Sequence, residues 1–103
     1  MERIEKLKKF LETNAADSFV QHALALEYVK LGDDTAARKL FEELLDRDPD
    51  YAGSYYHLGK LLERNNAPAE AIKVYESGMS VTEKSGDRHA LGELKSAYED
   101  LIG

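Results

Sequence analysis

Residues 24–49 read LALEYVKLGDDTAARKLFEELLDRDP, and the stretch 34 positions further on, residues 58–83, reads LGKLLERNNAPAEAIKVYESGMSVTE. Few residues are identical between the two stretches, but residue types recur at the same positions. The recurring pairs are Leu24 and Leu58, Ala25 and Gly59, Ala37 and Ala71, Leu40 and Val74, and Phe41 and Tyr75. A fixed period of this length indicates an array of helix-turn-helix units, in which small residues let paired helices approach and a large aromatic residue fills the space between pairs.

Apolar residues recur at steps of three and four through both stretches and through the segments on either side, which predicts amphipathic helices along the chain. The sequence is rich in good helix formers and has only two prolines. We therefore expect an all-α fold of about six helices. The predicted divisions are a half-repeat helix at residues 1–14, one repeat at 18–51, a second at 52–85 and a capping helix at 87–102, together forming a single domain over residues 1–103.

Turn residues mark the predicted helix ends. Asp17 or Ser18 is placed to cap the start of the second helix, and Gly32 supplies the left-handed residue that ends it. The third helix stops before Pro49, because a proline pushes the preceding residue out of helical angles. Asn66 is expected to cap the fifth helix.

Composition limits the class of protein. The 103 residues include no cysteine, are 43% hydrophobic and 33% charged, and carry a formal charge of -6. The lack of cysteine excludes a disulfide framework, a thiolate zinc site and a cysteine nucleophile, and it fits a cytoplasmic location. The acidic balance argues against nucleic acid or an anionic membrane as the main partner, because both need a concentrated basic surface.

Neither a membrane span nor a signal peptide is expected from the sequence. No apolar run of membrane-spanning length occurs, and the charged start MERIEK lacks the apolar core of a signal peptide. We expect a protein that is neither exported nor membrane-spanning. The initial Met1 and the atypical end helices favour a complete small protein.

The two repeated units resemble the tetratricopeptide repeat family. The positions that carry the resemblance are Leu24-Ala25, Tyr28, Gly32-Asp33, Ala37, Phe41 and Pro49 in the first unit, and Tyr55, Leu58-Gly59, Leu62, Ala71 and Tyr75 in the second. The resemblance implies a right-handed superhelical array of antiparallel helix pairs that binds a protein or peptide and needs no cofactor. Departures from the family pattern occur at Gln21, Asn66, Gly78 and Glu83.

In such an array the first helix of each pair lines a concave side, where ligands usually bind. Counting outward from the packing positions, we expect a partner-binding groove. Its predicted residues are Phe19, His22, Leu26, Val29, Lys30, Tyr56, Lys60, Glu63, Arg64, His89 and Glu93. Aromatic and apolar side chains beside cations would suit a peptide with an apolar anchor and acidic neighbours. Plain packing for Phe19 and Leu26, and a solvated charged face for Lys60 and Arg64, are the alternatives.

Metal binding and catalysis have little support in the sequence. The histidines His22, His57 and His89 fall on three separate predicted helices and form no pair at the four-residue spacing that a helical metal site uses. No serine lies on a strand-to-helix elbow, and no glycine-rich phosphate loop occurs. We therefore expect a non-catalytic protein without metal.

A second hypothesis is a self-assembling subunit. The two ends of a short array are helical faces, and an end with exposed apolar residues can pair with a second copy. A homodimer through the end helices would use Ile4, Phe10, Leu101 and Ile102.

Overall fold

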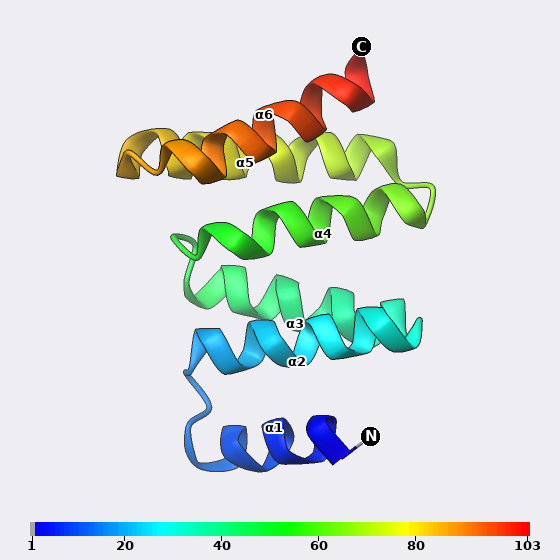
Figure 1. The fold of residues 1–103 in the computed structure, drawn as a ribbon, viewed down its shortest axis with the longest axis vertical. Helices are drawn as coiled ribbons and strands as arrows, with labels where there is room; N and C mark the ends of the chain where they lie inside the picture. Colours follow the sequence, from blue (N-terminus) through cyan, green and yellow to red (C-terminus); the bar gives the residue numbers. More distant parts are fainter. Residues whose placement is uncertain (1) are drawn as a thin grey trace. The chain divides into compact units, whose positions relative to one another are not determined.

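The computed structural model describes residues 2–103 and contains six α-helices and no strand within that range (Figure 1). The helices are α1 (Glu2–Thr13), α2 (Ser18–Leu31), α3 (Asp34–Arg47), α4 (Ala52–Arg64), α5 (Pro68–Ser85) and α6 (Arg88–Ile102). The all-α fold and the number of helices are confirmed. Met1, the first residue of the predicted half-repeat helix, lies outside the described residues. The helices fall into two compact units, α1–α3 ending at Asp48 and α4–α6 beginning at Pro49.

Aspartates cap three of the helices. The side chains of Asp17, Asp33 and Asp87 each accept a hydrogen bond from the backbone N–H three residues ahead, at 3.0, 3.2 and 3.1 Å. These contacts satisfy N–H groups that have no partner within their own helix. At the other end, Gly32 closes α2 with a φ of 78°, a left-handed conformation that glycine adopts without steric cost.

Asn66 does not cap α5, which corrects the prediction. The residue at the cap position is Ala67, which makes no side-chain hydrogen bond to the helix. Asn66 instead has a φ of 59°, so it occupies the left-handed turn that Gly32 occupies one repeat earlier. Asparagine tolerates this conformation better than other non-glycine residues. The departure from glycine therefore leaves the turn between α4 and α5 intact.

The core of the first unit lies between α2 and α3. Ala25, Ala37, Phe41 and Leu44 are completely buried there. Gln21, the departure from the usual apolar residue, is also buried, and its Nε2 donates a 3.0 Å hydrogen bond to the Leu40 carbonyl oxygen of α3. A buried amide that finds such a partner avoids most of its desolvation cost. Gln21 thus ties the two helices of the pair together.

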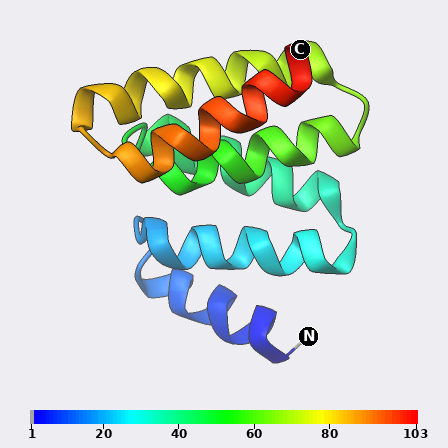
Figure 2. The ribbon, with the colours of Figure 1, turned by 45° about the horizontal axis from the view of Figure 1, so that its top comes forward.

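Helix α1 packs on α2 (Figure 2), and a small set of contacts holds it there. Ile4 is its one buried side chain among the described residues. The carboxylate of Glu27 in α2 lies 3.3 Å from Arg3 Nε and 3.1 Å from Lys30 Nζ. The hydrogen bond from Lys30, aided by Arg3, lowers the pKa of Glu27 below its usual value. Only Arg3 of these two cations belongs to α1, so the Arg3–Glu27 ion pair adds to the buried Ile4 in attaching the helix.

The second unit packs α5 against both α4 and α6. Two glycines permit this close packing. A Cβ on Gly59 would overlap the ring of Tyr75, and a Cβ on Gly78 would lie 2.7 Å from Cβ of Tyr55 and 3.0 Å from Cδ1 of Leu94. Real Cβ atoms do not approach other atoms so closely. The unusual glycine at residue 78 is explained by its position, where α5 meets its two neighbours.

Several large apolar residues are exposed. Leu31 and Ile102, the last residues of α2 and α6, are each 54% exposed, and Phe10 of α1 is 45% exposed. Conversely, Ile4 is buried and Leu101 is half-buried. Of the four residues assigned to a homodimer interface, only Phe10 and Ile102 are therefore exposed, and the prediction for Ile4 was wrong.

Candidate functional site

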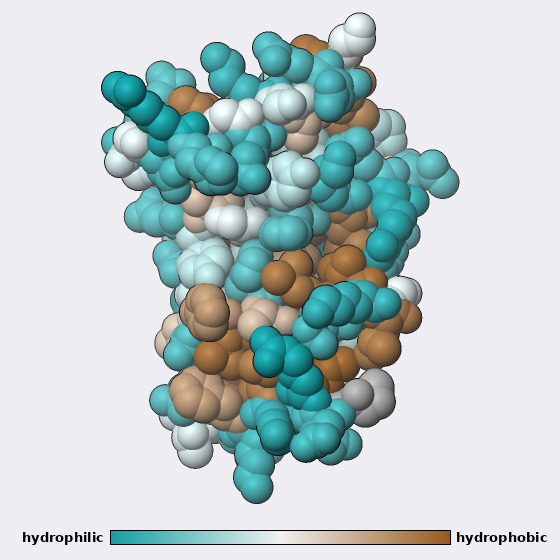
Figure 3. All heavy atoms as spheres, in the orientation of Figure 1, coloured by the Kyte–Doolittle hydropathy of each residue, from teal (hydrophilic) through white to brown (hydrophobic). Residues whose placement is uncertain are grey.

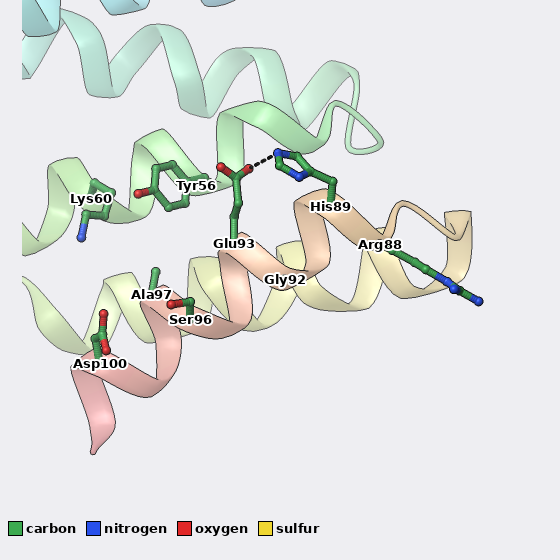
Figure 4. A pocket seen from close by; sticks show the side chains of 9 residues that line it. All are labelled: Tyr56, Lys60, Arg88, His89, Gly92, Glu93, Ser96, Ala97 and Asp100. Carbon is green, nitrogen blue, oxygen red and sulfur yellow. Dashed lines mark ion pairs between the residues drawn. The ribbon is translucent and has the colours of Figure 1, made fainter.

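The second unit contains an open groove of about 520 Å³ between α4 and α6 (Figure 4). Both walls come from helix faces left uncovered by packing, because α4 and α6 each turn their apolar stripe toward α5. The groove is lined by Tyr56 and Lys60 from α4, and by Arg88, His89, Gly92, Glu93, Ser96, Ala97 and Asp100 from α6. The groove combines one tyrosine ring, several charged groups and small side chains.

Adjacent tyrosines on α4 have different environments. Tyr55 is buried and donates a 2.6 Å hydrogen bond to the Pro49 carbonyl oxygen, while Tyr56 is half-buried and lines the groove. Successive residues of a helix are rotated by about 100° from each other, so Tyr55 and Tyr56 point in different directions from α4. The ring of Tyr56 meets that of His57 edge to face, with centroids 5.5 Å apart. The tyrosine ring is thereby held at the groove.

The charged side chains of the groove are unevenly paired. His89 Nε2 and Glu93 Oε1, one helical turn apart on α6, are separated by 3.7 Å. Lys60 Nζ lies 3.8 Å from Oε2 of Glu63, which follows it by three residues on α4. Figure 4 shows Glu93 and Asp100 directed from α6 toward α4, and Arg88 directed away from it. The carboxylates therefore point into the groove more than the guanidinium does.

Two residues behind the groove have shifted pKa values. Burial lowers the pKa of His57, and the negative charge of Glu93 partly opposes this shift. Burial also raises the pKa of Tyr75, and the hydrogen bond that its hydroxyl donates to the Glu63 carboxylate adds to the effect. Both groups are consequently held in their neutral forms at neutral pH.

The predicted partner-binding residues and the residues that line the groove are partly the same. Tyr56, Lys60, His89 and Glu93 line it, whereas Glu63 and Arg64 do not. The carboxylate of Glu63 accepts a hydrogen bond from the Tyr75 hydroxyl and pairs with Lys60. Sequence reasoning missed five lining residues, namely Arg88, Gly92, Ser96, Ala97 and Asp100. These residues are spaced three and four positions apart on one face of α6. The spacing would have identified them as groove residues if the contact between α4 and α6 had been known.

The remaining predicted residues belong to α2 in the first unit. Phe19 is 71% exposed, Leu26 and Val29 are half-buried, and Lys30 pairs with Glu27. His22 packs edge to face on Phe41, with ring centroids 5.7 Å apart. Figure 3 shows apolar surface gathered over α2 on the face in view. Phe19 is thus not a core residue, and the packing alternative for it is wrong.

Among residues 2–103, no group of three or more histidine or acidic side chains is arranged to hold a metal ion. In the same range, no helix combines the length and the apolar character needed to cross a membrane.

Comparison with known proteins places the chain in a family. A tetratricopeptide repeat model matches residues 22–78, which is more than half of the chain. The chain belongs to the tetratricopeptide repeat family. Proteins of this family generally mediate protein–protein interaction, and their repeats generally act as non-catalytic scaffolds.

The chain is similar to several known proteins, and the names of the first two contain the same repeat. A tetratricopeptide repeat domain protein from Salinibacter ruber is 44% identical, with a TM-score of 0.82 over 84% of this chain and 88% of that one. A TPR repeat-containing protein of Pseudomonas aeruginosa is 26% identical over 88% of this chain and 87% of its own length. The mouse aspartyl/asparaginyl beta-hydroxylase is 28% identical over 79% of this chain, which spans only 10% of that enzyme.

Proposed function

We propose that this protein is a non-catalytic interaction module that binds a segment of a partner protein in the groove between α4 and α6. The observation that carries the proposal is the half-buried Tyr56 ring, presented in an open groove beside charged side chains. Tyrosine is enriched where protein surfaces bind one another, because a rigid ring contributes contact area at a small entropic cost.

The chemistry of the groove supports a protein partner over a reaction. A catalytic centre requires polar groups that converge on one point. The polar groups of this groove are instead distributed along α4 and α6. The floor is formed by small residues, and a Cβ on Gly92 would meet nothing within 4 Å. A peptide backbone could therefore approach α6 closely.

Capture from a lysate of the source organism tests the proposal, with two variants that alter the groove in opposite ways. Tyr56→Ala removes the ring, and Gly92→Gln fills the floor with a neutral side chain where space is available. The matched controls are Tyr98→Ala and Glu99→Gln, which lie on α6 outside the groove.

A protein captured by the wild type and both controls, but lost from Tyr56→Ala and Gly92→Gln, is the expected result. Circular dichroism melting of each variant shows whether the helices remain folded. If the same proteins are captured by all five folded forms, the α4–α6 groove is not the binding surface and the proposal fails.

A further inference from the structure

The groove contains two carboxylates that lack a strong cationic partner. Asp100 makes no ion pair with any residue of the described chain, and Glu93 has only His89, 3.7 Å away, which carries a charge only when it is protonated. Both carboxylates point from α6 toward the α4 side of the groove (Figure 4). They lie seven residues apart, two turns along one face of the helix.

The two cations that line the groove do not neutralise them. Lys60 lies 3.8 Å from Glu63 on its own helix, so part of its charge is already compensated. Arg88 is directed away from α4 (Figure 4). Among the charged groups that line the groove, the carboxylates of Glu93 and Asp100 are therefore the ones that α6 directs across it toward the side of the Tyr56 ring.

Space for a long side chain is available between these groups. The floor is made by Gly92, Ser96 and Ala97, and the position where a Cβ of Gly92 would stand is open. An aromatic face beside a carboxylate is the environment that a lysine or arginine side chain prefers, since its charge can meet both.

From this geometry we infer that the partner segment places a lysine or arginine side chain in the α4–α6 groove, between Tyr56 and the carboxylates of Glu93 and Asp100. The inference rests on the proposed function and gives it a chemical class of ligand: a basic segment, instead of the acidic one that the sequence favoured. Lys60 of α4 also lines the groove, and its positive charge opposes binding.

The test uses short acetylated and amidated peptides that are identical except at one set of positions, which hold lysine, glutamate or glutamine. Each is titrated into the ¹⁵N-labelled full chain, and the amide signals of α4 and α6 are followed by NMR. We expect the lysine peptide to shift signals from Tyr56 and from Glu93 to Asp100, and to bind more weakly as salt is raised.

Charge variants then test the contact itself. Glu93→Gln and Asp100→Asn should each weaken binding of the lysine peptide about two- to five-fold, the range for partly exposed ion pairs. Lys60→Glu should tighten it by a similar factor. Glu99→Gln, which lies outside the groove, is the matched control and should leave the affinity unchanged.

Equal or tighter binding of the glutamate or glutamine peptide in the groove overturns the inference but leaves the groove as the interaction surface. Lysine-peptide shifts confined to other helices, or no shift in α4 and α6 with any peptide, also overturn it. In that case the capture experiment decides separately whether the groove binds a protein at all.

Discussion

The ring of Tyr75 in α5 lies against the backbone of Gly59 in α4, in the space that a side chain on residue 59 would need. This contact joins the two helices of the second repeat. Tyr75 is completely buried, so the ring has no room to move aside. The recurrence of a small residue and an aromatic ring at these positions is therefore a requirement of packing.

The first prediction concerns this contact. Gly59→Ala should lower the free energy of unfolding by about 1–3 kcal/mol, because the new methyl group overlaps a ring that cannot yield. Urea denaturation followed by circular dichroism measures the change. Gly92→Ala is the matched control, since nothing lies within 4 Å of its new Cβ. Removing a helical glycine there should instead stabilise the protein by about 0.5–1 kcal/mol. Equal effects at both positions would contradict the packing argument.

The second prediction concerns the two equivalent turns. Gly32→Ala should destabilise the protein by about 1–2 kcal/mol, because its φ of 78° is unfavourable for a residue with a Cβ. Asn66→Gly, at a φ of 59°, should not destabilise it, since glycine adopts that conformation freely. Thermal and urea unfolding of both variants provide the measurement. A loss of stability in Asn66→Gly comparable to that of Gly32→Ala would refute the equivalence of the turns.

The third prediction concerns the attachment of α1. Glu27→Gln removes the carboxylate that contacts Arg3 and Lys30, so α1 should separate from α2 more often. Hydrogen exchange measured by mass spectrometry should show faster exchange in residues 2–13 and unchanged exchange in α5. Glu42→Gln, which removes an ion pair with Arg38 within α3, is the control. Unchanged exchange in α1 would mean that the buried Ile4 and its apolar neighbours hold the helix by themselves.

The fourth prediction concerns pH. Because burial depresses the pKa of His57 in the folded protein, the unfolded state binds more protons once the pH falls below the ordinary histidine value of 6.5. Stability contributed by neutral His57 is present above that pH and is lost as the pH falls through the folded-state pKa. His57→Gln should therefore weaken the fall in melting temperature between about pH 6.5 and 5.

His89→Gln is the control for this pH series, because the His89 side chain is 88% exposed. It should change the dependence of melting temperature on pH less than His57→Gln does, because an exposed ion pair such as His89–Glu93 contributes little stability. Identical pH profiles for wild type and His57→Gln would show that His57 does not contribute to the acid sensitivity.

The sequence by itself determined the fold, because its signals are local or periodic. The three- and four-residue spacing of apolar side chains, the aspartates before α2 and α3, and Gly32 and Pro49 act within a turn or two of the chain. The recurrence of small and aromatic residues then indicated how successive helices pair. The same counting of helical positions assigned Tyr56 to the groove side of its helix.

Only the tertiary structure decided what the groove contains. The α6 wall, with Gly92, Ser96 and Asp100, is set by the rotation of that helix on α5, and the sequence gives no local signal for this angle. The close contacts of Gly78 with Tyr55 and Leu94 fix the rotation through packing. The direction of each charge follows from it, which is why an acidic ligand was expected from Lys60 and Arg64 while the carboxylates of α6 point into the groove.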